Sequence, residues 1–175
     1  MTASRLSLPE AEVSKYIQTS PLDVAGLLAG AHHPRAGAVV LFSGDVRDNN
    51  LGKQVDWLEY EAQEKMAAKI MADILEDAKE NWPLNIALAC HRTGKVMPGE
   101  AAVVVITASA HRREAFEANR YIIDRIKHEA PIWKCEIFSD GTKKWGGNCS
   151  CAEITGKPDK HVYEYDLKTE KTPQP

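Results

Sequence analysis

Four of the basic side chains in one stretch of the sequence, residues 109–136, could together bind an anion and move protons. His111 and Arg112 are neighbours near its start, Lys127 comes sixteen positions after His111, and Lys134 follows seven positions later. Arginine binds carboxylates and phosphates through paired hydrogen bonds, whereas lysine acts as a compact positive charge. A lysine held beside other cations and away from water has a lowered pKa, so it can act as an acid, a base or a nucleophile near neutral pH.

Each of these residues also has an ordinary structural explanation. An arginine at the start of a helix is usually a solvated surface charge, and a lysine near the end of a helix complements the macrodipole. A lysine on an edge strand, as Lys134 could be, discourages pairing with other chains. The combination within one stretch, rather than any single position, favours an anion-binding site with acid–base chemistry.

The stretch itself predicts a helix followed by a strand. Ser109 is a plausible N-cap, and the residues that recur at steps of three and four positions are Phe116, Asn119, Arg120, Ile122, Ile123 and Ile126. This spacing is typical of an amphipathic helix. Pro131 ends the helix and favours extended geometry at Ala130, so residues 132–134 are expected to begin a strand. The His–Arg pair then lies at one end of the helix, and the two lysines lie at or beyond the other.

The rest of the chain alternates further strands and helices. Strands are predicted at residues 36–43, 55–60, 86–90 and 101–108, with a weaker one at residues 11–19. A short helix is expected from Ser20–Pro21 to about Ala31. A longer helix over residues 64–82 carries an apolar stripe assigned to the core: Met66, Ala67, Ile70, Met71, Ile74, Leu75 and Ala78. This order favours an α+β protein, an α/β sandwich with helices packed on a mixed sheet.

Arg47 lies in a segment rich in turn-forming residues, 44–52, which joins two of the predicted strands. The glycines and asparagines there predict a long hairpin with Arg47 at its mouth. Two interpretations stay open. Arg47 is solvated on a surface turn, or Arg47 and nearby backbone N–H groups face an anion.

Composition and charge limit the function further. The 175 residues are enough for one domain, assigned to residues 1–148, and the polar segment 149–175 is expected to be partly disordered or ordered by a partner. A net charge of −3 argues against nucleic-acid binding. The apolar runs are too short to span a membrane and the N-terminus lacks a signal sequence, so we expect a cytoplasmic protein. The cysteines lack zinc-site spacing and are predicted to be reduced thiols: Cys90, Cys135, Cys149 and Cys151.

Three separated motifs then carry a family resemblance. The first is Phe42-Ser43-Gly44-Asp45-Val46-Arg47, with Asn50 and Gly52, and the second is His91-Arg92-x-Gly94 with Pro98-Gly99-Glu100. The third runs from Ala110-His111-Arg112-x-x-Ala115-Phe116-x-Ala118 through Ile123-Asp124-x-x-Lys127 to Ala130-Pro131-x-Trp133-Lys134-x-Glu136. Over roughly residues 10–148 the chain resembles the large, catalytic subunit of molybdopterin synthase. The resemblance implies a mainly antiparallel, hammerhead-like fold with packed helices and a small β subdomain.

The resemblance also implies an activity and partners. The family dimerises, and each end of the dimer holds a small ubiquitin-like subunit whose C-terminal Gly-Gly carries a thiocarboxylate. Two sulfurs pass to cyclic pyranopterin monophosphate, which gives the dithiolene of molybdopterin. The implied catalytic residues are Lys127 and Lys134, with no metal and no cofactor. The implied substrate-binding set adds Asp45, Val46, Arg47, His111, Arg112, Cys135 and Glu136. Cys135 departs from the family, which commonly has a second basic residue there.

The predicted helix raises a geometric problem. His111 and Lys127 would be about 24 Å apart along it, too far for one small-molecule pocket. A two-fold dimer with facing helix ends would solve this, so we expect His111 and Arg112 to serve the pocket around Lys127 of a second copy. Two other functions stay open: an adaptor that only docks a ubiquitin-like protein, and a phosphate-ester enzyme without a protein partner. For the latter, the sequence offers no nucleophile elbow, P-loop or metal cluster.

Overall fold

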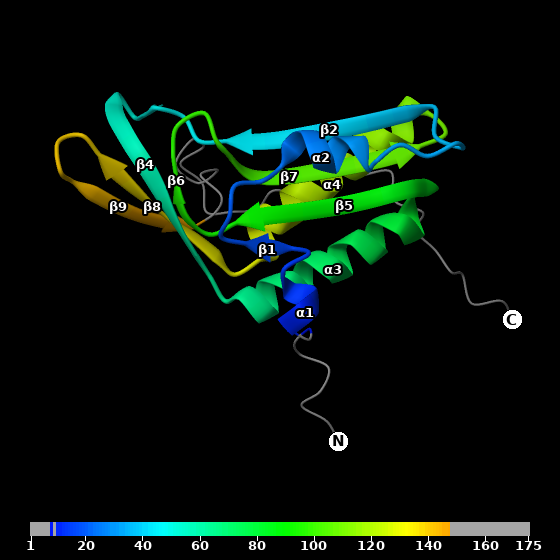
Figure 1. Ribbon diagram of the computed structural model, residues 1–175, viewed down its shortest axis with the longest axis horizontal. Coiled ribbons are helices and arrows are strands. Elements are labelled where there is room, and N and C mark those ends of the chain that lie inside the picture. The colour runs from blue at the N-terminus through cyan, green and yellow to red at the C-terminus, as the bar shows by residue number, and fades with distance from the viewer. Residues whose placement is uncertain (1–7, 9, 148–175) are drawn as a thin grey trace, which may run out of the picture.

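The structure is a computed structural model that describes residue 8 and residues 10–147. The predicted tail, with Cys149 and Cys151, lies outside the described residues. The chain folds into two antiparallel-rich sheets, one of four and one of five strands, with two long helices against the four-stranded one (Figure 1). This arrangement confirms the predicted α+β class with a mainly antiparallel sheet and packed helices.

The strands of the four-stranded sheet lie in the order β1-β5-β7-β2. They span Ile17–Gln18, Leu84–Arg92, Ala101–Ser109 and Ala38–Asp45 respectively. All neighbours are antiparallel except β1 and β5, which run parallel. β7 is buried along nearly its whole length because the sheet is covered on both faces there. β2 forms the outer edge of this sheet.

The five-stranded sheet is built around β4 (Lys53–Ala62), which pairs with β8 (Ile132–Phe138). The hairpin partner β3 (Asn49–Asn50) and the short β6 (Gly94–Val96) also pair with β4, and β9 (Lys143–Gly147) pairs with β8. The predicted long hairpin between the strands at 36–43 and 55–60 is therefore wrong. The turn-rich segment between them carries the chain from one sheet into the other, because β2 finds its apolar partner in β7.

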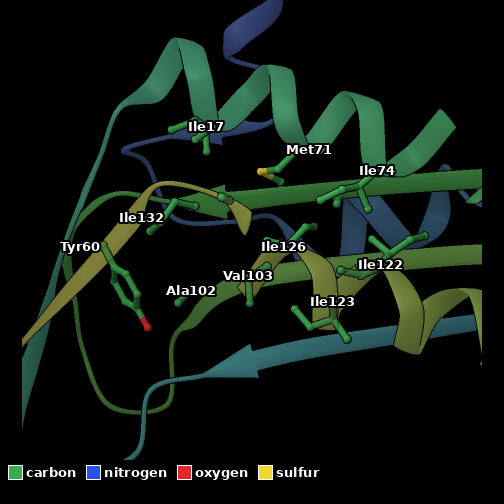
Figure 2. Close-up of a cluster of buried hydrophobic side chains, with 14 of the residues drawn as sticks. Ile17, Tyr60, Met71, Ile74, Ala102, Val103, Ile122, Ile123, Ile126 and Ile132 are labelled. Atoms are coloured by element: carbon green, nitrogen blue, oxygen red, sulfur yellow. The ribbon is translucent and has the colours of Figure 1, made fainter. Parts of the chain in front are cut away.

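Two helices of eighteen residues each cover one face of the four-stranded sheet: α3 (Glu64–Asn81) and α4 (Arg112–Glu129). Figure 2 shows Met71 and Ile74 of α3 and Ile122 and Ile126 of α4 in the core between these elements and β7. These four side chains are fully buried. The opposite face of the sheet packs a second, smaller core against α2 (Val24–Ala29), and α1 (Glu10–Val13) contacts α3. None of the described helices is long and apolar enough to cross a membrane.

Several local predictions need correction. Ser109 does not cap α4: it ends β7, where its hydroxyl donates to the carbonyl oxygen of Pro83 at 3.0 Å, and His111 takes the N-cap position. Phe116 lies on the outside of α4, with 61% of its surface exposed.

Other corrections concern the N-terminal third of the chain. The segment 11–19 holds most of α1 and the two-residue β1 in place of one strand. α2 begins at Val24 because Asp23, not Ser20, accepts the capping hydrogen bond, from the N–H of Gly26 at 2.9 Å. The end of the described chain, with Gly146 and Gly147, forms β9.

Candidate functional site

The end of α4 and the start of β8 place the two candidate catalytic lysines together. The N–H of Ala130 still donates to Ile126, but its backbone is extended (φ −71°, ψ 129°) because Pro131 follows. The chain therefore turns at once into β8, and Lys134 lies opposite Tyr60 of β4. The break predicted at Pro131 is confirmed, and it is what brings Lys134 back towards Lys127.

Lys127 has the electrostatics of an acid–base residue. Partial burial lowers the pKa of its ammonium, and the positive charge of Lys134 lowers it further. Asp124, one turn earlier on α4, acts in the opposite direction and raises the pKa of Lys127. Removal from water and a like charge both favour the neutral amine, which can accept a proton.

Lys134 is held by a buried carboxylate. Its Nζ lies 3.3 Å from Oε1 of Glu136, and only 16% and 7% of the two side chains are exposed. The other oxygen, Oε2 of Glu136, accepts a hydrogen bond of 2.7 Å from Nδ2 of Asn50. Glu136, one of the predicted substrate-binding residues, is thus the direct partner of Lys134.

Tyr60 is a member of this cluster that the sequence analysis missed. Burial, and then the negative charge of Glu136, raise the pKa of its phenol to about 12, so the hydroxyl stays protonated at neutral pH. The ring of Tyr60 packs edge-on against His91 at 5.1 Å between centroids. Regular alternation along this strand would place Val55, Trp57 and Glu59 on one face. An irregularity between Val55 and Trp57 breaks the alternation, so Val55 is buried like Leu58 and Tyr60.

The end of β2 and the segment after it hold three of the predicted residues. Val46 is buried, and its backbone N–H and C=O bond to Glu100 and Gly99 at 3.0 and 2.8 Å. These two backbone hydrogen bonds fix the point at which the chain leaves the four-stranded sheet. Asp45 and Arg47, on either side of Val46, are exposed, and Asp45 accepts a hydrogen bond from the hydroxyl of Ser43.

His111 and Arg112 lie at the other end of α4. Both are exposed, and they line an open hollow of about 490 Å³ with Gly37, Ala110 and Arg113. With eighteen residues, α4 is about 27 Å long, so one chain does not bring this pair to Lys127. The hollow is open and basic, as a site for an anionic group requires.

Cys135 lies between Lys134 and Glu136 on β8, so its side chain points to the opposite face of the strand. It is paired with Glu59 on one side and Trp145 on the other, and only 2% of it is exposed. Burial raises the pKa of its thiol. Among the described residues, no group of three or more His, Cys, Asp or Glu side chains could hold a metal ion.

The cluster around Lys127 thus joins residues from α4, β4 and β8. A family model described as MoaE protein matches residues 17–129, more than half of the chain. The chain belongs to the MoaE family. The matched residues include Lys127 but end before Lys134 and Glu136, so geometry is what joins these two residues to Lys127.

Individual relatives agree with the family match. The chain is 41% identical over 135 residues to the molybdopterin synthase catalytic subunit of Thermoplasma volcanium, which covers 76% of this chain and 98% of the relative. It is also similar to the crystal structure of molybdopterin synthase from Staphylococcus aureus, with 38% identity and a TM-score of 0.72. That likeness covers 77% of this MoaE chain and 97% of the other.

A more distant likeness extends to a solved protein–protein complex of subunits 1 and 2 of the molybdopterin-converting factor from Helicobacter pylori. The identity is 23% and the TM-score 0.62, over 75% of this chain and 88% of that chain. At this identity the likeness shows the MoaE fold alone.

Proposed function

We propose that this MoaE chain is the catalytic subunit of a molybdopterin synthase, a sulfurtransferase. It takes two sulfurs from the C-terminal thiocarboxylate of a small ubiquitin-like carrier and delivers them to cyclic pyranopterin monophosphate, which forms the molybdopterin dithiolene. The family match and the names of the relatives support this proposal. The observation that carries it is the pairing of Lys127, with its lowered pKa, and Lys134 beside a buried carboxylate.

The chemistry needs both fixed charge and proton transfer. In each transfer the carrier's sulfur forms a bond to a substrate carbon, and water then cleaves the acyl–sulfur bond to leave a carboxylate on the carrier. Lys127 is suited to remove and return protons because burial and the charge of Lys134 lower the pKa of its ammonium and so favour the neutral amine. Lys134 stays oriented by Glu136 and stabilises negative charge on the thiocarboxylate. The protonated hydroxyl of Tyr60 is available as a further donor.

The carrier is the proposed protein partner. Both the thiocarboxylate and the substrate phosphate are anionic, so a pocket that receives them together needs several cations. One chain supplies Lys127 and Lys134 at one end of α4 and Arg112 at the other. The distant fold likeness to a two-subunit complex is compatible with this partner.

A second copy would complete the pocket if it paired along the outer edge of β2. His111 and Gly37 both line the open hollow near the start of β2. Arg47 lies just beyond the end of β2. A two-fold axis beside β2 would make the two strands antiparallel and bring the hollow of one copy to the lysines of the other. We therefore propose that the pocket is shared between two copies.

The exposed side of α4 supports the same arrangement. Arg112, Phe116 and Lys127 lie on one side of the helix by its 3.6-residue period, and α3 packs against another side through Tyr121 and Arg125. Phe116 is large, apolar and exposed on α4, the helix that packs against β2. A second copy along the outer edge of β2 would remove that surface from water.

A turnover assay tests the proposal. Purified protein is mixed with the cyclic substrate and a thiocarboxylated carrier, and dithiolene product is followed for wild type, Lys127→Ala and Lys79→Ala. Lys79 occupies the last turn of α3 in an exposed ion pair with Glu76, which makes it a matched control. Product from wild type and Lys79→Ala but not from Lys127→Ala is the expected result. Carrier binding without product in wild type would favour the adaptor instead.

A further inference from the structure

One hydrogen bond ties the substrate-binding segment to the lysine pair. Asn50 belongs to β3, three positions after Arg47, and Glu136 belongs to β8, 86 positions further along the chain. Nδ2 of Asn50 donates to Oε2 of Glu136 at 2.7 Å. The contact joins the tip of the β3–β4 hairpin to the strand that carries Lys134.

The chemistry of this contact is directional. A carboxylate accepts hydrogen bonds only, and a buried one is costly unless its oxygens are satisfied. Glu136 presents Oε1 to Lys134 and Oε2 to Asn50, with 7% of its side chain exposed. Because the amide occupies Oε2, the carboxylate cannot rotate away without losing a donor. The orientation of Lys134 therefore depends on Asn50 through Glu136.

We propose that Asn50 is a positioning residue for the sulfur-transfer reaction, which acts by holding Glu136 so that Lys134 faces Lys127. This inference rests on the proposed function. The side chain of Asn50 is connected to Lys134 through Glu136, to which both are bound. The same hydrogen bond links the position of Arg47, on the connecting segment, to that of the lysines.

The neighbouring residue provides a matched control. Asn49 is also in β3, but it is exposed and its amide donates to the carboxylate of Asp48 at 2.7 Å. Successive residues of a strand point to opposite faces, so Asn49 does not point towards Glu136. Equal substitutions at the two positions add the same charge to the same hairpin.

The experiment compares Asn50→Asp, Asn50→Ala and Asn49→Asp with wild type, using the thiocarboxylated carrier and the cyclic substrate. Asn50→Asp keeps the shape but replaces the N–H donor by an acceptor that repels Glu136. We expect kcat to fall by about ten- to a hundredfold in both Asn50 variants, with little change in KM for the carrier. Asn49→Asp should match wild type.

The pH profile separates positioning from simple stability. The charged groups that act on Lys127 are Lys134 and Asp124. An added carboxylate beside Glu136 favours protonated Lys127, so the limb of the rate profile that reports Lys127 should move to higher pH in Asn50→Asp. In Asn50→Ala, Lys134 no longer faces Lys127 and lowers its pKa less, so the limb should also move to higher pH there, whereas it should not move in Asn49→Asp.

Three results would overturn the inference. Wild-type kcat in both Asn50 variants is the first. The second is a loss in Asn50→Asp that Asn49→Asp reproduces. The third is a loss that tracks a lower melting temperature, with an unmoved pH profile. Absence of turnover in wild type itself would instead remove the proposed function, and this inference with it.

Discussion

Lys127 near the end of α4 and Lys134 in β8 lie close enough that the charge of Lys134 lowers the pKa of Lys127. Partial burial lowers that pKa more strongly still. Two ammonium groups in one partly buried place repel each other, and in the described chain Asp124 and Glu136 only partly offset this. The arrangement costs the free protein stability and favours the binding of anions, which would supply the missing negative charge.

Replacing Lys127 by methionine should therefore raise stability while it removes activity. Lys127→Met keeps the length and removes the charge, so the melting temperature at neutral pH should rise. Turnover should fall by about 10²–10⁴-fold if Lys127 moves protons. Thermal unfolding and the turnover assay measure the two effects on the same preparation, with Lys79→Met as the control that changes neither.

The pH dependence of stability carries a defined sign. Because folding lowers the pKa of Lys127, the unfolded chain binds more protons between the lowered value and the ordinary value for lysine. Wild-type stability should therefore gain as pH rises through that window, and Lys127→Met should lack this gain. The free energy of unfolding in urea is measured at several pH values for both proteins. If it changes with pH equally in the two, the pKa of Lys127 is not perturbed by its surroundings.

Mixed dimers should reveal whether the pocket is shared. Arg112→Ala and Lys127→Ala each remove one half of the proposed pocket, at opposite ends of α4. When the two variants are mixed and allowed to exchange, heterodimers should contain one intact pocket and recover part of the wild-type turnover. Each variant incubated alone controls for residual activity. Complete lack of recovery, with heterodimers demonstrated by differential tagging, would exclude the shared pocket.

The sequence predicted the parts of the site that depend on local signals. The helix over α4, its end at Pro131 and the strand that follows all depend on spacing or on proline, which act over a few residues. The lysine pair follows from those elements once the chain turns at Ala130. Family membership, first stated as a resemblance, is confirmed by the match over residues 17–129.

The rest required long-range contacts that spacing does not encode. β2 and β4 read as one hairpin because the segment between them is rich in turn formers, yet they belong to different sheets. Ser109 resembled an N-cap, but its hydroxyl bonds to Pro83 instead. The bond between Asn50 and Glu136 joins residues 86 positions apart, so no local pattern reveals it.

The turn between β8 and β9 should make stability sensitive to acid. Hydrogen bonds from the side chain and backbone of Thr142, and then from Lys53, lower the pKa of Asp140 to about 2. The unfolded chain takes up this proton first, so the stabilisation is present above about pH 4 and is lost as pH falls towards 2. Asp140→Asn should be less stable than wild type at pH 7, and urea unfolding should show the gap closing in acid. A gap that stays constant with pH would contradict this origin.

The tip of the β3–β4 hairpin holds a strained residue whose replacement should stabilise the protein. Leu51 has φ of +50° and is 73% exposed, and Gly52 beside it has φ of +77°. Two consecutive positive φ angles define the type I′ turn, which favours Asn-Gly, and a left-handed backbone costs an ordinary residue about 1–2 kcal/mol. Leu51→Asn should therefore raise the free energy of unfolding by up to about 1 kcal/mol, whereas Gly52→Ala should lower it.

The Leu51→Asn variant also tests whether the backbone strain at Leu51 serves the reaction. Leu51 is exposed and has a strained φ angle, next to Asn50 and near Arg47. A contact between Leu51 and the substrate or the carrier would explain why a leucine is kept in this strained conformation. If so, Leu51→Asn should be more stable than wild type and yet have a higher KM for the carrier. Greater stability with an unchanged KM would confine Leu51 to a structural role. A loss of stability in urea unfolding would contradict the turn assignment itself.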